Sequence, residues 1–251
     1  MSAEKTRILI TNDDGYHSEG IVALEAALSE IGDVYVVAPA SEMSGASHSL
    51  TLARPLRIRQ IDARHWTVDG TPTDCVTLAI NQIFSFEERP HICASGINHG
   101  PNLGDDATYS GTVAGALEAT ILGVPGLAFS LVANRSHDFT ESVKIARQIT
   151  QKAINEGLPE GTLLNINVPK GEPKGIRITK QGFKNARPII SEHIDPRGKP
   201  YYWIGEVREG FHAGEGGTDF EAIDEGFVSV TPMRSDLTNH KAIELLKSWE
   251  I

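Results

Sequence analysis

An apolar run that ends in two adjacent carboxylates is the feature that most constrains the fold of this chain. Residues 7–15 read Arg-Ile-Leu-Ile-Thr-Asn-Asp-Asp-Gly. The consecutive apolar residues from Ile8 to Ile10 predict a strand covered on both faces, because a half-exposed strand would alternate apolar and polar residues. Sheets of such strands bind ligands beyond the carboxyl ends of the strands, and here Asp13 and Asp14 follow directly.

The pair of carboxylates has two interpretations. Adjacent like charges repel each other, so a bound divalent cation or a proton would explain why Asp13 and Asp14 stand together. An ordinary turn explains them equally well, since Asp and Gly are common turn residues. Residues 7–15 alone do not decide between a metal site and a turn, although Gly15 would let the backbone turn away from the carboxylates in either case.

Strand-like and helix-like segments alternate through the first two thirds of the chain. This alternation predicts a Rossmann-like, doubly wound α/β fold with a mostly parallel sheet. A short antiparallel ribbon is expected at 56–60 and 65–68, and a long glycine-rich loop at 96–111. We expect parallel strands at 8–11, 33–39, 91–95, 126–132 and 163–168, and helices at 18–32, 72–84 (capped by Thr71 or Thr73), 112–122 and 138–155.

The pattern changes after Pro169. Prolines, glycines and charges dominate residues 170–200, and helical periodicity returns only near the end of the chain. We interpret residues 1–169 as a Rossmann-like catalytic core. Residues 170–251 are interpreted as a β-rich C-terminal oligomerisation arm that also supplies the last core strand and a terminal helix. The segments expected here are strands at 175–179, 201–207 and 227–231 and a helix at 238–249.

Composition excludes some partners. The chain has 251 residues, with 33 acidic and 23 basic side chains and a formal net charge of −10. Without a basic face, binding to a nucleic-acid polymer is disfavoured, whereas a small anion can bind if a metal or backbone amides supply positive potential. Cys75 and Cys93 lie in apolar segments and indicate a reducing compartment without disulfides. The polar first residues and the absence of a long apolar run predict a cytoplasmic protein without a membrane span.

Polar side chains concentrate in the loops that follow the predicted parallel strands. Since these strand ends meet at one edge of the sheet, the loops can build a single site. Carboxylate, hydroxyl and amide oxygens are hard ligands that suit Mg²⁺ or Mn²⁺ better than zinc or copper. The candidates are Asn12, Asp13, Asp14 and His17 in the first loop, Ser41, Ser44, Ser47 and Ser49 in the second, and Asn98, Asn102, Asp105, Asp106, Ser110 and Thr112 in the third.

Ser110-Gly111-Thr112 precedes a predicted helix and also has two interpretations. Free backbone amides, the helix dipole and two hydroxyls make the start of this helix a candidate anion site. A plain N-cap explains Ser110 or Thr112 without any ligand. The neighbouring glycines favour a ligand, because they let the backbone approach it closely.

Several common catalytic motifs are absent. The chain has no Gly-x-Gly-x-x-Gly, no P-loop, no Gly-x-Ser-x-Gly and no His-Glu-x-x-His. These absences disfavour dinucleotide enzymes, NTPases, α/β-hydrolases and metalloproteases. Among the histidines, His240 with Asp236 could protonate a leaving alkoxide, or could simply begin the terminal helix. His65, His91 and His193 are interpreted as surface or packing residues.

Taken together, the separated blocks resemble the SurE family (survival protein E) over essentially the whole chain. That family comprises metal-dependent nucleoside-monophosphate phosphatases. The matching blocks are Ile-Thr-Asn-Asp-Asp-Gly (10–15), Val-Ala-Pro (37–39), Ser-Gly-Ala-Ser (44–47), Ser-Leu-Thr (49–51), Gly-Thr-Pro-Thr-Asp-Cys-Val (70–76), Ser-Gly-Ile-Asn (95–98), Gly-Pro-Asn-Leu-Gly-Asp-Asp (100–106), Tyr-Ser-Gly-Thr-Val (109–113), Gly-Thr-Asp-Phe (217–220) and Gly-Phe-Val-Ser-Val-Thr-Pro (226–232).

The resemblance implies a reaction and a set of site residues. It implies hydrolysis of nucleoside 5′- and 3′-monophosphates, with short polyphosphate as a further substrate, by one Mg²⁺ or Mn²⁺ per subunit of a homodimer or homotetramer. Beyond the resemblance, we expect Asp13 or Asp14 to orient the attacking water, and His240 with Asp236 to supply the leaving-group proton. The implied metal ligands are Asp13, Asp14, Ser44 and Asn98, and the residues around the phosphate are Asn12, Asn102, Ser110, Gly111 and Thr112.

Two other functions stay open at this point. A nucleotide- or metal-sensing module could use the same crevice without turnover. A metal-dependent phosphatase that acts mainly on non-nucleotides is the other alternative, because no base-recognition pocket can be identified from the sequence.

Overall fold

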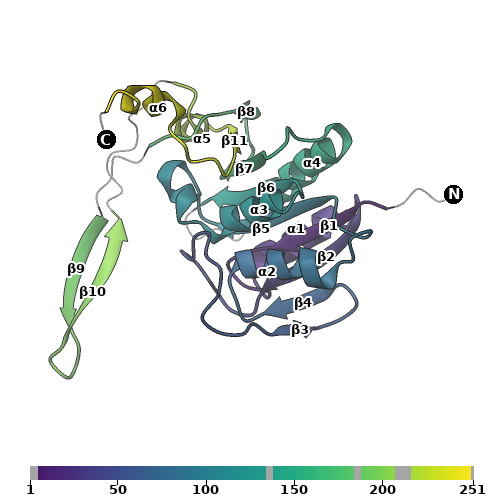
Figure 1. Ribbon diagram of the computed structural model, residues 1–251, viewed down its shortest axis with the longest axis horizontal. Helices are drawn as coiled ribbons and strands as arrows, with labels where there is room; N and C mark the ends of the chain where they lie inside the picture. Colours follow the sequence, from purple (N-terminus) through teal and green to yellow (C-terminus); the bar gives the residue numbers. More distant parts are fainter. Residues whose placement is uncertain (1–4, 134–137, 184–187, 207–215, 250–251) are drawn as a thin grey trace.

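A single nine-stranded sheet forms the centre of the part of the chain that the structure describes. The computed structural model describes residues 5–133, 138–183, 188–206 and 216–249. The strand order is β3-β4-β2-β1-β5-β6-β7-β11-β8 (Figure 1). These strands are β1 (Arg7–Thr11), β2 (Asp33–Pro39), β3 (Ile58–Gln60), β4 (His65–Val68), β5 (Ile92–His99), β6 (Gly126–Val132), β7 (Leu163–Pro169), β8 (Ile176–Ile178) and β11 (Val228–Met233).

The order of the parallel strands reverses next to β1. The chain runs outward from β1 through β2 and β4, and it then returns to β5 on the other side of β1 before continuing to β6 and β7. These six strands are parallel to one another, so the predicted Rossmann-like, doubly wound fold is confirmed. The point between β1 and β5 is a topological switch point, where open α/β sheets bind ligands.

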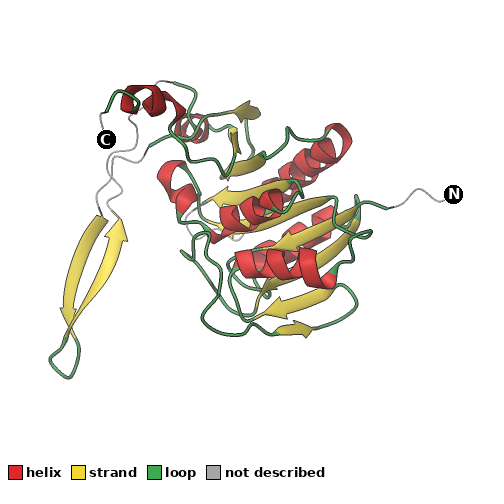
Figure 2. Cartoon of the chain, viewed as in Figure 1, coloured by secondary structure: helices red, strands yellow, loops and turns green. Residues whose placement is uncertain are grey.

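Helices cover both faces of the sheet (Figure 2). On one face, α1 (Glu19–Leu28) and α4 (Thr140–Glu156) pack over Ile8 and Ile10. On the opposite face of the sheet lie α2 (Pro72–Leu78) and α3 (Gly111–Ile121). Leu9 packs into the core on this face, beside α2. Burial of all three central residues of β1 is what the apolar run predicts.

Two segments near the site differ from their predicted form. The helix expected at 72–84 is α2 followed by the π-helical η1 (Ala79–Ile83), and Thr71 rather than Thr73 caps it. The strand expected to end at residue 95 continues to His99, because β5 resumes its pairing with β6 after a register shift between Ser95 and Asn98. The following loop is correspondingly shorter and contains the 3₁₀ turn η2 (Gly104–Thr108).

The last third of the chain contributes to the main sheet and also forms a separate hairpin. β11 pairs antiparallel with β7 and parallel with β8. β9 (Pro188–Ile194) and β10 (Pro200–Glu206) form an antiparallel hairpin that projects away from the sheet (Figure 1). β9 and the short α5 (Asp219–Asp224) were not expected, and α6 (His240–Leu246) is shorter than the predicted helix. Val207, the expected end of β10, lies outside the described residues.

None of the helices in the described ranges combines the length and the apolar character needed to cross a bilayer.

Candidate functional site

The first loop of the site is a tight turn at the end of β1. Asn12 is buried, and its Nδ2 donates to the backbone oxygen of Gly15 (3.0 Å) and to Oγ of Ser18 (2.7 Å). Gly15 has φ +93°, and a Cβ there would lie 3.2 Å from the backbone of Ser41. The positive φ therefore favours glycine at the turn that follows the two carboxylates, and a side chain there would also crowd the backbone of Ser41.

Asp13 lies against the N-terminus of α3. Burial raises the pKa of Asp13, although hydrogen bonds from the Thr112 hydroxyl and from the backbone N–H groups of Gly111 and Thr112 favour its charged form. A Cβ on Gly111 would lie only 2.7 Å from Cβ of Asp13. Glycine at position 111 is thus what lets the helix end approach the carboxylate.

The start of α3 has the N-cap that one interpretation of Ser110-Gly111-Thr112 predicts, and binding of an external anion there stays a prediction. Ser110 is the N-cap, and its Oγ accepts the N–H of Val113 at 3.1 Å. The next two backbone amides face the carboxylate of Asp13, a residue of the chain itself. The positive end of the helix dipole therefore stabilises the negative charge of the Asp13 carboxylate.

Asp14 stands beside Asp13 in an environment that disfavours its ionisation. Burial, then the negative charge of Asp13, raise the pKa of Asp14 to about 6, while a hydrogen bond from the backbone N–H of His99 partly opposes this shift. Glu42 adds a further negative charge nearby. A divalent cation between the carboxylates would remove the repulsion, so the chemistry of this donor set fits a metal ion.

The second loop and β5 carry the other two predicted metal ligands. The backbone N–H of Met43 donates to the backbone oxygen of Asp13 (2.7 Å), which places Ser44 next to the first loop. Ser44 is exposed, and its Oγ donates to Glu42 at 3.0 Å. The Nδ2 of Asn98 donates to the backbone oxygen of Gly100 (2.9 Å), so its carbonyl oxygen is the atom that can serve as a ligand.

The predicted donor set contains only two carboxylates. Accordingly, no group of three or more His, Cys, Asp or Glu side chains arranged to hold a metal is found in the described residues. Any cation at this site would complete its coordination with hydroxyl, amide and water oxygens, as Mg²⁺ commonly does.

Two asparagines of β7 hold Asn102 in place. The backbone N–H of Asn102 donates to Oδ1 of Asn167 (2.8 Å), and its backbone oxygen accepts Nδ2 of Asn165 (2.8 Å). Its own Nδ2 donates to Oγ of Ser130 (2.8 Å). Asn165 and Asn167 are not among the predicted site residues, although two polar residues at i and i+2 in an otherwise apolar strand are a detectable signal.

Hydrogen bonds between polar side chains connect the second loop to α2 and α3. Nε2 of His48 lies 2.8 Å from Oε2 of Glu118, and the hydroxyl of Thr77 donates to Oε1 of the same carboxylate at 2.7 Å. Oγ of Ser47 donates to the backbone oxygen of Thr108 at 2.7 Å. The segment that carries Ser44 is therefore attached to the same helix whose N-terminus faces Asp13.

Asp236 and His240 contact each other in the segment that follows β11. Nε2 of His240 lies 2.7 Å from Asp236, and both side chains are exposed. Hydrogen bonds from Thr238, then the contact with His240, lower the pKa of Asp236. Among the described residues, no hydrogen bond or ion pair joins this pair to the predicted metal ligands.

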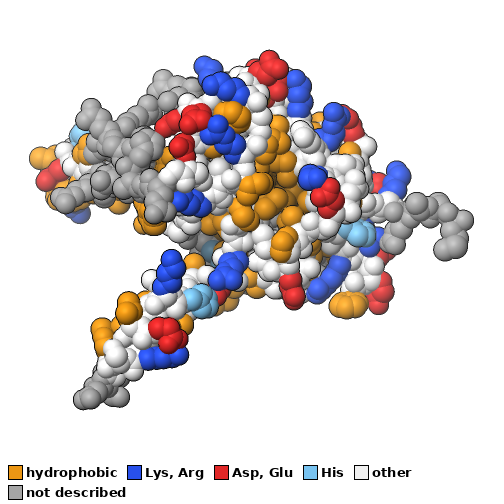
Figure 3. Space-filling view, turned by 90° about the horizontal axis from the view of Figure 1, so that it is seen from above, with side chains coloured by type: hydrophobic (Ala, Val, Ile, Leu, Met, Phe, Trp, Pro, Cys, Tyr) orange, Lys and Arg blue, Asp and Glu red, His pale blue; other side chains and the backbone are white. Residues whose placement is uncertain are grey.

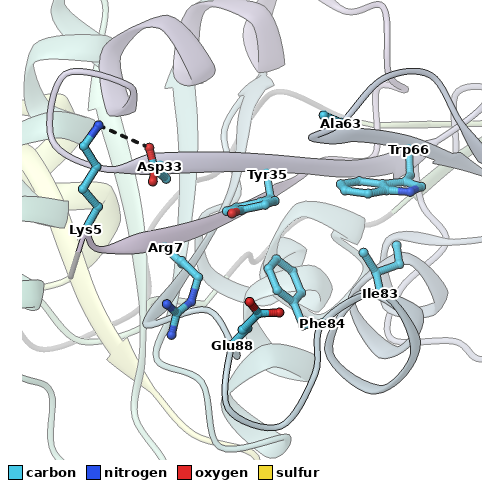
Figure 4. Close-up of a pocket in the computed structure, with 9 residues that line it drawn as sticks. All are labelled: Lys5, Arg7, Asp33, Tyr35, Ala63, Trp66, Ile83, Phe84 and Glu88. Carbon is cyan, nitrogen blue, oxygen red and sulfur yellow. Dashed lines mark ion pairs between the residues drawn. The ribbon is translucent and has the colours of Figure 1, made fainter.

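A hollow of about 370 Å³ lies at the opposite, amino-terminal edge of the sheet (Figure 4). Aromatic rings of Tyr35, Trp66 and Phe84 line it together with side chains of both charges, including Arg7 and Glu88. Because Arg7 begins β1 whereas Asp13 follows its end, this hollow is separate from the strand-end site.

The fold and the loops define an α/β protein with an acidic, oxygen-rich site at the switch point of its sheet. The chain belongs to the SurE family, because the family model described as survival protein SurE matches residues 8–188.

Curated relatives match over nearly their full length. The 5'-nucleotidase SurE of Aquifex aeolicus is 49% identical over 246 residues, which cover 96% of this chain and 97% of that protein. The 5'-nucleotidase SurE of Myxococcus xanthus is 47% identical over 253 residues, covering 100% of this chain and 96% of that protein. The crystal structure of the SurE protein from Aquifex aeolicus matches with a TM-score of 0.84 at 49% identity, covering 96% of this chain and 98% of that one.

Proposed function

We propose that this protein is a metal-dependent phosphomonoesterase that hydrolyses nucleoside 5′- and 3′-monophosphates. The carrying observation is the pair Asp13 and Asp14 at the switch point, with the N-terminus of α3 held directly against Asp13. The relatives named 5'-nucleotidase SurE support the nucleotide substrate. Short-chain polyphosphate is a further proposed substrate, because it presents the same terminal phosphate group.

One Mg²⁺ or Mn²⁺ per subunit is the proposed cofactor, held by Asp13, Asp14, Ser44 and Asn98. A cation here would neutralise charge on a phosphoryl oxygen, where negative charge develops during transfer. The raised pKa values of both carboxylates support this assignment.

The chain's own groups have the remaining tasks. Asp13 or Asp14 orients the attacking water in line with the leaving group. Ser110, Gly111 and Thr112 at the start of α3 are the proposed phosphate contacts. The hydroxyl of Ser110 would donate to a phosphoryl oxygen, while Gly111 and Thr112, whose amides donate to Asp13, would keep that carboxylate beside the phosphate. Asn12 and Asn102 border the phosphate, and His240 with Asp236 is the proposed source of the leaving-group proton.

We also propose a homodimer or homotetramer built through the C-terminal segments. Supporting this, α6 has no buried residues in the single chain. A second apolar surface lies between α4 and β8 and includes Leu158, Ile176 and Ile178. Figure 3 looks onto this face and shows its apolar side chains gathered together.

Phosphate release tests the reaction. The substrates are a 5′-monophosphate, a 3′-monophosphate, p-nitrophenyl phosphate and short polyphosphate, each with and without EDTA. We expect release from the monophosphates, loss of release in EDTA and recovery when Mg²⁺ or Mn²⁺ is restored. Asp14→Asn should lower kcat/KM by at least about a hundredfold. Glu30→Gln, which removes an exposed carboxylate paired with Arg147, should not.

Three results would contradict parts of the proposal. Release that survives complete removal of metal would contradict the metal requirement. Release from p-nitrophenyl phosphate alone would contradict the nucleotide substrate. No release from any of the four compounds would indicate a binding module that uses the same crevice without turnover.

A further inference from the structure

A carboxylate outside the proposed mechanism lies fully buried at the start of α5. Asp219 is 0% exposed. Its Oδ2 accepts the backbone N–H of Gly104 at 2.8 Å, and its Oδ1 accepts the backbone N–H groups of Gly182 and Phe220, both at 2.9 Å. Because a buried charge is costly unless it is well hydrogen-bonded, three N–H donors on one carboxylate indicate a specific structural task.

Gly104 is held on all sides by residues that are distant in sequence. In addition to the contact with Asp219, its backbone oxygen accepts Nε2 of Gln181 at 2.9 Å. A Cβ on Gly104 would lie 2.5 Å from the ring of Phe220, and so would one on Gly182. The third loop is therefore fastened at Gly104 to two segments of the C-terminal third.

This attachment lies two residues from Asn102, which β7 already holds. Asn167 and Asn165 fix the backbone of Asn102 from the sheet, and Asp219 fixes Gly104 from α5. Together, these two attachments hold the backbone of residues 102–104 in a fixed position. The chain continues from there through η2 to the N-terminus of α3, where Gly111 and Thr112 contact Asp13.

We propose that Asp219 is a positioning residue: by holding Gly104, it sets where the third loop presents its phosphate-binding groups. This inference rests on the proposed phosphatase function and extends it to a residue that touches neither metal nor substrate. Binding of the phosphate would then depend on the hydrogen bond between Gly104 and Asp219, two residues more than a hundred positions apart in the sequence.

The substitution Asp219→Asn separates this role from simple stability. The asparagine can still accept from Gly182 and Phe220, but its NH₂ group would face the N–H of Gly104 and release the loop. We expect KM for a nucleoside monophosphate to rise about tenfold, and inhibition by inorganic phosphate to weaken equally, with a much smaller change in kcat. Hydrogen exchange in residues 100–106 should become faster while exchange in β1 and β6 stays unchanged.

Matched variants make the result decisive. Asp224→Asn, in the same helix but exposed, should leave KM, phosphate inhibition and exchange at wild-type values. Gln181→Ala removes the second contact to Gly104 from a half-buried position and should move the same readouts in the same direction, so it serves if Asp219→Asn does not fold.

Two outcomes would overturn the proposal. One is unchanged KM, phosphate inhibition and exchange in folded Asp219→Asn, or in Gln181→Ala where the first variant does not fold. The other is a fall in maximal rate that matches the loss of folded protein, with KM unchanged, because that is a purely structural effect. If the wild type released no phosphate at all, the proposed function would fail instead, and exchange alone would decide whether Asp219 holds the loop.

Discussion

The absence of a side chain at Gly111 is what allows the start of α3 to contact Asp13 in the candidate site. A Cβ at this position would lie 2.7 Å from Cβ and 2.9 Å from Oδ2 of Asp13. Gly111→Ala should therefore push the carboxylate away from the helix end and misplace any bound cation. We expect phosphatase activity to fall about a hundredfold, as for other displacements of about 1 Å at a catalytic group. Steady-state kinetics and metal titration of the variant test this.

A control for this substitution comes from the hairpin. Gly205 lies in β10, and a Cβ there would make an ordinary contact of 3.6 Å with the backbone of Ile189. Gly205→Ala should keep wild-type activity. Equal activity of Gly111→Ala and the wild type would show that close contact between the start of α3 and Asp13 does not hold this carboxylate in place.

The contacts of a residue could be inferred from the sequence where its partners are its neighbours along the chain, and could not where they lie on distant segments. Asp13, Asp14 and Gly15 stand out in the sequence because of their neighbours, a buried strand before them and a turn at Gly15. Asn165 stands out in the sequence as a polar residue in an apolar strand, but its partner, like that of Asp219, lies on a distant segment that only the folded chain brings close. The metal and phosphate roles implied by the family resemblance, and the proton-donor role expected of His240 with Asp236, stay predictions.

Among the elements, α2 is the one whose N-terminus is most fully capped. The hydroxyl of Thr71 accepts the N–H of Asp74, and the carboxylate of Asp74 accepts the N–H of Thr71 in return. Thr71→Ala removes this capping hydroxyl and should lower the free energy of unfolding by about 1 kcal/mol. Thr71→Ser keeps the hydroxyl and should cost much less. Urea denaturation compares the two, and equal losses would contradict a capping role.

The edge ribbon of β3 and β4 is joined to α1 through His65. Burial alone would lower the pKa of His65, but hydrogen bonds from its ring to Asp62 and Glu25 outweigh burial and raise it. A raised folded-state pKa means that this stabilisation is fully present below the ordinary value of about 6.5. It is lost as the pH rises through the higher, folded-state value.

The pH dependence of unfolding tests this link. Between about pH 6 and about pH 9, the urea midpoint of the wild type should fall more than that of His65→Gln. Tyr16 also faces this cluster, with its ring 6.1 Å from that of His65, so Tyr16→Phe serves as the control and should behave like the wild type. Parallel pH profiles for the wild type and His65→Gln would rule out the contribution. From the sequence, His65 is expected only as a surface or packing residue, because Asp62 and Glu25 become its partners only in the folded chain.

Elements were predictable where periodicity and burial agree. α1 and α4 were expected because their apolar residues recur at helical spacing and face the sheet, and the structure confirms both. β9 was missed because it pairs only with β10 and gains no burial from the sheet that organises the other strands. β5 extends further than expected because β6 pairs with it beyond the register shift, which no local pattern reveals.

For the whole molecule, the hairpin of β9 and β10 is the feature that a single chain does not explain. Its strand pairing places Ile190 opposite Ile204 on one face and Trp203 opposite Ser191 on the other. Ile190 is 55% exposed, Trp203 65% and Ile204 79%. An isolated two-stranded hairpin is marginally stable at best in water, and its apolar side chains are exposed on both faces, so we expect each face to pack against another chain.

Interrupting either face of the hairpin should therefore break the assembly. We expect the wild type to have the mass of a dimer or tetramer in analytical ultracentrifugation. Ile204→Asp on one face and Trp203→Asp on the other should each lower that mass, because a charge buried in an apolar interface is strongly unfavourable. Lys199→Gln, beside the hairpin turn, should leave the mass unchanged. A monomeric wild type would contradict the oligomer outright, whereas loss of mass in only one of the two Asp variants would show that a single face of the hairpin meets its partner.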